Sequence, residues 1–241
     1  MRRPWSDVVI DDCGEPLVSI KPRFLCLEPH PYACVGAPYG EGADPYRLRS
    51  GVLERLVAAQ TLLSKCSDPE VGVVQLAIFD AWRPIRVQAF MVEYAVQEQC
   101  RSQGFDPADP SMASALEQVQ HDVARFWAPP SPDPCTPPPH STGGAVDLTL
   151  ADSSGRPLDM GGEIDAIGDQ SIPDHHAQKA ALNPNGDAAR WHGRRCLLND
   201  VMTQAGFARH PNEWWHFSHG DQLWAWQLQT RAAIYASVPS S

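Results

Sequence analysis

Basic residues are scarce in this chain of 241 amino acids. Lysine and arginine number 19 against 29 aspartates and glutamates, which gives a formal net charge of −10. Proteins whose main task is to grip phosphate backbones carry a basic surface. No basic tract, and no basic stripe interleaved with aromatic residues, offsets the acidic balance. We therefore expect no nucleic-acid partner.

Long apolar runs are also absent. The most apolar stretch, Val71–Phe79, is interrupted by Gln75 and is far shorter than the roughly 20 residues of a membrane-spanning helix. Arg2 and Arg3 are not followed by the apolar segment that secretory and twin-arginine signals require. These absences predict a cytoplasmic protein that has no membrane partner.

Paired cysteine motifs are missing too. The seven cysteines are odd in number and widely scattered, and none of them forms a C-x-x-C motif. This excludes a complete set of intrachain disulfides and a cysteine-rich zinc module. Reduced thiols, as in cytosolic enzymes, are the expected state.

The rest of the composition is that of a folded globular protein. Hydrophobic residues make up 43% of the chain and charged residues 20%, unlike the composition of disordered proteins. The segment 128–140 holds seven prolines and has the composition either of an interdomain linker or of a stiff loop. We favour a loop that braces the residue after it, and hence one domain over 1–241 with flexible ends at 1–6 and 236–241.

Hydrophobic periodicity predicts helices and short strands in an irregular order. Helical spacing covers 48–65, 85–100, 112–127, 188–204 and 221–235, with Ser111 as the expected N-cap of the third helix. Strands are expected at 8–10, 17–20, 71–79, 145–150 and 213–218. Residues 156–187, rich in glycine, aspartate and proline, predict a long functional loop. This order favours an α+β fold with a small, mostly antiparallel sheet flanked by helices.

Two polar clusters have the composition of a zinc site. His140 and Asp147 flank the pair Gly143–Gly144, and His216 follows later in the chain. A catalytic zinc ion typically takes three protein ligands and leaves a fourth position for water. The glycines permit a tight turn that returns both side chains toward one ion, and the preceding prolines limit the entropy lost on metal binding. The pattern predicts one Zn²⁺ per chain, bound by His140, Asp147 and His216.

Glu213 and Arg83 are suited to hydrolysis beside such an ion. Because positions i and i+3 of a regular strand face opposite sides, Glu213 and His216 share a site only if the chain bends at Trp214–Trp215. Glu213 would then take a proton from a metal-bound water and pass it to a leaving amine. Arg83 would meet the anionic oxygen of a tetrahedral intermediate. The alternative for Arg83 is an ordinary ion pair with Asp80.

These motifs occur together in a known family. The pattern H-x6-D, then E-x-W-H, with D-x-W/Y-R-P upstream, resembles the VanX-type D-alanyl-D-alanine dipeptidases of the zinc D,D-peptidase superfamily. The similarity runs from about Leu48 to Phe217. The resemblance implies a Hedgehog/D,D-peptidase-like zinc fold and hydrolysis of a small dipeptide, with D-alanyl-D-alanine as the favoured substrate. It gives the same metal ligands and the same roles to Glu213 and Arg83.

The resemblance also concerns substrate binding. Asp165 falls close to the acidic position that receives the ammonium group of the substrate, although Asp159, Glu163 and Asp169 lie nearby. One position departs from the family pattern. Family members carry a serine two residues before the first histidine, where it helps to hold the substrate carboxylate, whereas this chain has Pro138. The identity of the dipeptide therefore stays open.

Other interpretations of the same residues exist. By residue type, His175, His176, His219 and Cys135 are also potential ligands, but we expect them in loop or supporting positions because three ligands are already assigned. A peptidoglycan D,D-carboxypeptidase or endopeptidase would use the same centre, and the missing export signal disfavours it. A zinc-stabilised binding module without turnover would need neither Glu213 nor Arg83. A homo-oligomer is compatible with the sequence.

Overall fold

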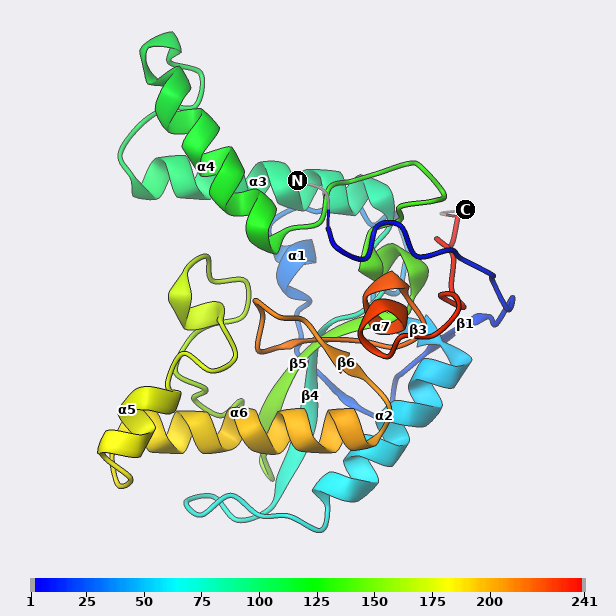
Figure 1. Cartoon of the computed structure of the whole chain (residues 1–241), viewed down its shortest axis with the longest axis vertical. Helices are drawn as coiled ribbons and strands as arrows, with labels where there is room; N and C mark the ends of the chain where they lie inside the picture. The colour runs from blue at the N-terminus through cyan, green and yellow to red at the C-terminus, as the bar shows by residue number, and fades with distance from the viewer. Residues whose placement is uncertain (1–2, 240–241) are drawn as a thin grey trace.

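The computed structural model describes residues 3–239, and at their centre lies a mixed sheet (Figure 1). Within these residues five strands pair in the order β2-β4-β5-β7-β6. Their bounds are β2 Leu25–Cys26, β4 Val74–Asp80, β5 Ala145–Asp152, β7 His216–Ser218 and β6 Ala208–Arg209. Only the β2–β4 pair is parallel among these described strands. A small antiparallel ribbon pairs β1 (Leu17–Ser19) with β3 (Arg47–Arg49). The predicted α+β fold with a mostly antiparallel sheet is confirmed.

Helices cover the sheet and extend beyond it. They are α1 Pro31–Cys34, α2 Ser50–Leu63, α3 Ile85–Ser102, α4 Ala113–Phe126, α5 Ala177–Leu182, α6 Asp187–Gln204 and α7 Gln222–Gln227. Short 3₁₀ turns span Pro110–Met112, Pro139–Thr142 and Asp169–Ser171. In Figure 1, α2 and α6 lie against the lower part of the sheet, whereas α3 and α4 pair above it. The helices predicted at 48–65, 85–100, 112–127 and 188–204 are confirmed.

The alternation of side chains along the central strands separates a core face from a polar face. Every second residue of β4 and β5 is an aliphatic side chain that packs with α2 and α6 in the main core: Val74, Leu76, Ile78, Val146, Leu148 and Leu150. Phe217 of β7 joins the same core. Because successive strand residues point to opposite faces, the residues next to Phe217 and those between the core residues of β5 face the other way. The polar residues of the site are found on this second face.

A second hydrophobic cluster lies on the other side of the site. It is formed by α3 and α4, with Val87, Met91, Val119 and Val123 at its centre, and Tyr32 of α1 packs into it. The α3–α4 pair projects from the upper left of the molecule in Figure 1. The site therefore lies between the polar face of the sheet and the base of this helical pair.

Some of the predicted elements are wrong. Residues 8–10 form only one isolated bridge, Ile10–Ala233, because the backbone bonds that follow run irregularly to the C-terminal segment. Ser111 does not cap α4; instead Asp109 accepts its backbone N–H at the start of the preceding 3₁₀ turn. The last helix ends at Gln227 rather than 235, because Gln229 has a left-handed φ of 54° that a helix cannot continue through.

The proline-rich segment does not separate two domains. Strand β4 precedes it and strand β5 follows it, yet the two strands are antiparallel neighbours in one sheet. A single domain is therefore the observed organisation. At the N-terminal end, Trp5 is buried and Arg3 donates to backbone carbonyls of α4. The outermost parts of the predicted flexible ends, 1–2 and 240–241, lie outside the described residues.

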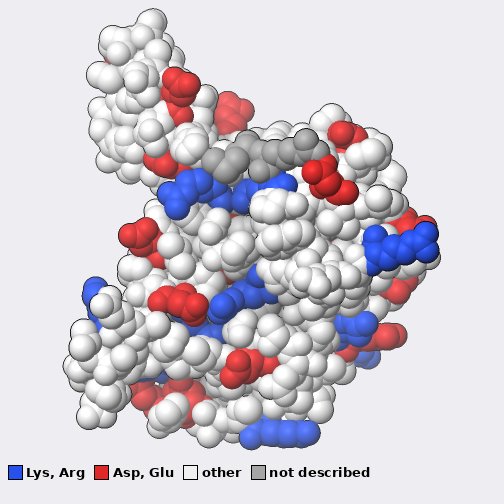
Figure 2. Space-filling model, in the orientation of Figure 1, with Lys and Arg blue, Asp and Glu red and all other residues white. Residues whose placement is uncertain are grey.

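The surface mixes charges of both signs. On the face drawn in Figure 2, acidic and basic side chains are interspersed over the described residues rather than gathered into one broad area. None of the helices within 3–239 has both the length and the apolar character needed to cross a membrane.

Candidate active site

Three acidic or imidazole side chains form a row across the sheet. Asp147 of β5 lies opposite His216 of β7 on one side and opposite Asp80 of β4 on the other. Residues directly opposite one another in an antiparallel pair present their side chains on the same face. The register shifts between Ile78 and Asp80, so Asp80 takes the place in this row that Phe79 would have in a regular ladder. Strand pairing thus brings together residues more than sixty positions apart.

His140 enters the site from the 3₁₀ turn just before β5. Gly143 has a φ of 71°, and a Cβ atom there would collide with the Leu17 side chain. A Cβ on Gly144 would lie 2.6 Å from the backbone oxygen of His219. The tight turn that the sequence predicts therefore requires both glycines, and it returns His140 to the start of the strand that carries Asp147.

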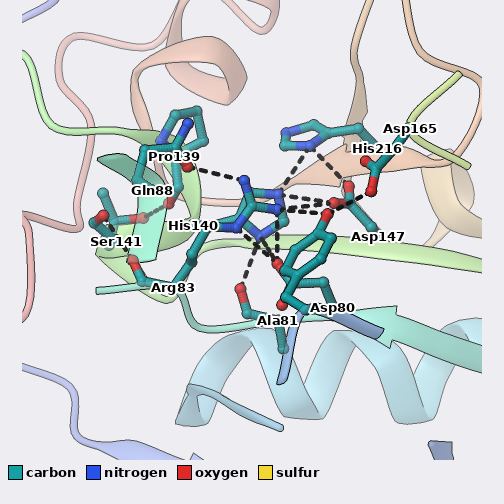
Figure 3. Close-up of polar contacts among 12 residues, drawn as sticks. Asp80, Ala81, Arg83, Gln88, Pro139, His140, Ser141, Asp147, Asp165 and His216 are labelled. Atoms are coloured by element: carbon teal, nitrogen blue, oxygen red, sulfur yellow. Dashed lines mark hydrogen bonds and ion pairs between the residues drawn. The ribbon is translucent and has the colours of Figure 1, made fainter. Parts of the chain in front are cut away.

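The hydrogen bond made by His140 leaves one ring nitrogen free. Its Nδ1 lies 2.7 Å from the carbonyl oxygen of Ala81, which can only accept, so Nδ1 carries the proton. Its Nε2 lies 3.2 Å from Asp147 Oδ2 and 3.2 Å from His216 Nδ1. The lone pair of Nε2 is therefore directed at the other two side chains (Figure 3).

His216 is held by a chain of hydrogen bonds on its far side. Its Nδ1 lies 3.0 Å from Asp147 Oδ1, while its Nε2 lies 3.2 Å from Ser218 Oγ. The Ser218 hydroxyl donates to Asp221 Oδ2 at 2.7 Å. Asp221 Oδ1 accepts the backbone N–H of Trp224 at 2.9 Å and so caps α7. With its hydroxyl proton directed to Asp221, Ser218 accepts from Nε2–H, which leaves the Nδ1 lone pair for the site.

The resulting cluster fits a metal ion. One ligand atom from each of His140, Asp147 and His216 lies within 4.8 Å of the others, and all three side chains are buried. Burial alone would raise the pKa of Asp147, but His140 and His216 lower it well below its usual range. Two imidazole nitrogens and one carboxylate form a donor set that zinc accepts readily.

Glu213 lies beside this cluster because the chain bends. Trp214 and Trp215 are bend residues, and β7 begins only at His216, so the local geometry that a shared site requires is present. Glu213 Oε2 lies 3.7 Å from His216 Nδ1, and Oε1 lies 3.4 Å from His210 Nδ1. Burial and the nearby charge of Asp147 raise the pKa of Glu213 well above its usual value. This carboxyl group is therefore inclined to hold a proton.

Arg83 lies at the opposite side of the cluster, in a dense network (Figure 3). Its Nε and Nη2 donate to Asp80 Oδ2 at 3.1 and 2.7 Å. Its Nη1 donates to Gln88 Oε1 at 2.8 Å, and Nη2 also reaches Asp147 Oδ2 at 3.4 Å. The guanidinium group lies over the rings of Tyr32 and Trp127. The ion pair with Asp80 is present, and Arg83 also reaches Asp147 of the cluster; its role toward an intermediate stays a prediction.

Asp165 lies on the same side as Arg83. The Tyr32 hydroxyl donates to Asp165 Oδ2 at 2.8 Å and accepts from Arg83 Nη2 at 3.2 Å. Burial, together with the charge of Asp147, raises the pKa of Asp165 to about 7. Its backbone has a positive φ of 65°, a costly conformation for a residue other than glycine. The loop therefore holds this carboxyl group toward the cluster at some conformational cost.

These side chains line one pocket. Its volume is about 270 Å³, and the lining includes the three clustered side chains together with Glu213, Arg83 and Asp165. Pro137, Pro138 and Pro139 form part of its wall. The proline-rich segment thus shapes the cavity as well as preceding His140.

The other potential ligands lie elsewhere. His176 Nε2 bonds to the carbonyl oxygen of Gly161 and its ring packs on Trp191, and His175 lies against it. His219 accepts from the side chain of Arg55, and the Cys135 thiol is exposed. Within the described chain, the group of side chains that could hold a metal contains none of these.

Sequence reasoning missed two residues of the site. Tyr32 bridges Arg83 and Asp165, but a lone tyrosine in a proline-rich segment carries no spacing signal. His210 lies beside Glu213 and lines the pocket. Its position three residues before Glu213 is a signal that could have drawn attention to it.

Comparison with known proteins shows the family to which the chain belongs. A family model described as D-Ala-D-Ala dipeptidase, of the M15 peptidases, matches residues 26–235. The chain belongs to this family. The match includes every residue of the cluster and its neighbours described above, and it confirms the resemblance drawn from the motifs. Dipeptide hydrolysis is therefore the activity that the family supports.

Individual members of the D-Ala-D-Ala dipeptidase family show how far the similarity extends. A D-alanyl-D-alanine dipeptidase from Synechocystis sp. is 46% identical over 235 residues, which is 95% of this chain and 92% of that protein. One from Escherichia coli is 30% identical over 160 residues, covering 66% of this chain and 63% of that protein. One from Enterococcus faecalis is 34% identical over 84 residues, 34% of this chain and 37% of that protein.

Proposed function

We propose that this protein is a zinc-dependent dipeptidase that hydrolyses D-alanyl-D-alanine. The observation that carries the proposal is the convergence of His140, Asp147 and His216 beside Glu213 in a single buried pocket. A purely structural zinc site is typically closed by four protein ligands, whereas a catalytic site keeps a position open. Three converging ligands and a neighbouring carboxyl group fit the catalytic kind.

The metal would be held by His140 Nε2, His216 Nδ1 and the carboxylate of Asp147. Zinc bound there would supply a Lewis acid that polarises the scissile carbonyl and makes a water molecule more acidic. The protein fixes the ligands beforehand, since Ala81 and Ser218 orient the two imidazole rings.

Glu213 is the proposed proton carrier. Its ionised form takes a proton from the attacking water, and its protonated form gives that proton to the nitrogen of the leaving amino acid. General acid–base transfer by a positioned side chain is worth about 10²–10⁴ in rate and works best when the pKa lies near the working pH. The raised pKa of Glu213 supports the donating half of this cycle.

Arg83 is the proposed stabiliser of the tetrahedral intermediate. Asp80, Gln88 and Tyr32 hold its guanidinium group from three sides, so little reorganisation is needed when charge develops on the substrate oxygen. Preorganised donors of this kind contribute roughly 10²–10³ to the rate.

Asp165 is the proposed receptor for the ammonium group of the substrate. A free amino terminus carries a positive charge, which favours the ionised form of a carboxyl group whose pKa lies at about 7 in the empty pocket. A small pocket with a receptor for the free amino end accepts a dipeptide and excludes longer chains whose amino end is acylated.

The experiment compares free D-alanyl-D-alanine with its N-acetylated form on wild-type protein, Glu213→Gln and Glu163→Gln. Glu163 is an exposed carboxylate near Asp165 that does not line the pocket, and it serves as the matched control. We expect hydrolysis of the free dipeptide alone, loss of about 10²-fold or more in Glu213→Gln with zinc content retained, and no change in Glu163→Gln. Preference for the acetylated compound would indicate a peptidoglycan carboxypeptidase, and full activity of Glu213→Gln would refute the mechanism.

A further inference from the structure

The pocket is lined by side chains of both charges. Three carboxyl groups line it, from Asp147, Asp165 and Glu213, and within the described chain only two cationic side chains do so, those of Arg83 and Arg3. A dipeptide zwitterion carries an ammonium group at one end and a carboxylate at the other. The first charge has a receptor in Asp165 under the proposed function, but the second has none yet.

The charge of Arg83 is already balanced. Two of its N–H groups point at Asp80, which is buried and ionised, and others reach Gln88 and Tyr32. A carboxylate that approached Arg83 would also meet the negative charges of Asp80 and Asp147. Most N–H groups of Arg83 are thus already bonded, which leaves little capacity to bind both oxygens of a substrate carboxylate.

Arg3 forms no ion pair with a carboxylate of residues 3–239. Its Nη1 donates to the carbonyl oxygen of Arg125 at 3.0 Å, and its Nη2 donates to those of Ala124 and Trp127 at 3.1 and 3.3 Å. All three acceptors are neutral, and no carboxylate of residues 3–239 lies within the 4.0 Å of an ion pair. A guanidinium group has five N–H donors, so Nε–H and one Nη1–H remain without a bond to the described chain.

Arg3 lines the same pocket as Glu213, beside which the carboxylate of the substrate is expected. Arg3, Glu213 and His210 line the same pocket, and the charge of Arg3 acts on both of the other side chains. Glu213 protonates the leaving nitrogen, and the carbon bonded to that nitrogen carries the terminal carboxylate. The carboxylate must therefore lie within two bonds of the atom that Glu213 serves, on the side away from Asp165.

The neighbouring wall has no donor at the position where family members carry a serine. Pro138 lines the pocket without a hydroxyl or an N–H group. The N-terminal segment runs beside this wall, because the amide of Gln222 donates both to the Val8 carbonyl at 2.7 Å and to the Cys135 carbonyl at 3.0 Å. Arg3 thus adds a cation to a wall whose other donors are neutral hydroxyl groups, those of Ser131 and Thr136.

We propose that Arg3 binds the C-terminal carboxylate of the dipeptide and makes the enzyme selective for substrates whose carboxyl end is free. This assignment rests on the proposed function. A guanidinium group and a carboxylate form charge-assisted hydrogen bonds, and Nε–H and one Nη1–H of Arg3 are the donors left for a carboxylate. Asp165 and Arg3 then bind the two ends of the zwitterion in one pocket.

The competing explanation is that Arg3 only stabilises the end of α4, where a cation interacts well with the last carbonyls. The test compares D-alanyl-D-alanine with its C-terminal amide, which lacks the negative charge. The variants are Arg3→Ala, Arg3→Gln, which keeps neutral donors for the α4 carbonyls, and Arg125→Ala. Arg125 is an exposed arginine of the same helix end that does not line the pocket.

In the wild type we expect kcat/KM for the acid to exceed that for the amide. Arg3→Ala and Arg3→Gln should lower kcat/KM for the acid by roughly 10–100-fold, mainly through KM, and leave the amide within about twofold. Arg125→Ala should change neither. An equal fall for acid and amide, or no change in either, would overturn the assignment to Arg3 while leaving the dipeptidase function intact. A wild type that hydrolyses neither compound would overturn the proposed function and the assignment with it.

Discussion

The hydrogen bonds that link His216 to Ser218 and Asp221 predict that Asp221→Asn alters the protonation of a proposed metal ligand. In the present arrangement the proton of Ser218 Oγ points to Asp221 Oδ2, so the Ser218 oxygen accepts from His216 Nε2–H. Asp221 Oδ1 meanwhile accepts the N–H of Trp224. The two oxygens of one carboxylate therefore serve the helix cap and the metal ligand at the same time.

An asparagine cannot satisfy both partners. If its oxygen keeps the cap, its NH₂ group faces Ser218, and the Ser218 hydroxyl must turn its proton toward His216 Nε2. The ring then carries its proton on Nδ1, the nitrogen that faces Asp147, and loses the lone pair that would bind zinc. If the amide is flipped instead, its NH₂ group opposes the N–H of Trp224 and the cap is lost, at a cost of about 1 kcal/mol.

The first arrangement weakens metal binding directly, whereas the flipped one keeps the His216 tautomer and destabilises α7. The first is the outcome expected where the cap is kept. Loss of a hydrogen-bonded partner behind a metal ligand typically costs 10–100-fold in metal affinity, which corresponds to roughly 1.4–2.8 kcal/mol. We therefore expect Asp221→Asn to bind zinc about 10–100-fold more weakly than wild type in competition with a chelator. Nitrogen NMR of the metal-free variant should show the His216 proton shifted from Nε2 toward Nδ1.

The matched control is Asp109→Asn. Asp109 also caps a short helical turn, by accepting the N–H of Ser111, but it is exposed and does not line the pocket. It should bind zinc as the wild type does. An Asp221→Asn protein with wild-type zinc affinity and an unchanged His216 tautomer would refute the reasoning.

Two further predictions concern the opposite side of the pocket. Folding raises the pKa of Asp165 to about 7, so between pH 4 and 7 this group binds more protons in the folded state than in the unfolded chain. The free energy of unfolding therefore falls as the pH rises from 4 through 7. Asp165→Asn should therefore raise the urea midpoint of the metal-free protein at pH 8 and leave it nearly unchanged close to pH 4; an equal shift at both pH values would contradict this. Arg83→Lys keeps the positive charge but loses the planar guanidinium group that Asp80 and Gln88 hold in place. We expect kcat to fall roughly 10²-fold while the zinc content stays unchanged. A variant in which only KM changes would argue against stabilisation of the intermediate by Arg83.

The sequence alone determined which residue types could perform the chemistry. The spacing of His140 and Asp147 around two glycines, and of Glu213 before His216, singled out residues that the structure places in one pocket. The long helices were equally predictable, because a continuous apolar face such as that of α2 is a property of local spacing.

The short elements depended on the tertiary structure. Strands β2, β3 and β6 have only two or three residues each, and such segments carry too few alternating positions to be recognised. They exist because neighbouring strands supply their hydrogen bonds. The end of the last helix was likewise set by the turn at Gln229 and not by hydrophobic spacing.

The tertiary structure also decided the partners within the site. A register shift in β4 puts Asp80 opposite Asp147, and folding brings Tyr32 to Asp165 across 133 positions of the chain. Arg3 reaches the pocket only because the N-terminal segment packs against the end of α4. Periodicity and motif spacing describe interactions between near neighbours in the chain. The contacts that set the charge balance of this pocket join distant segments, so they are fixed by strand register and packing.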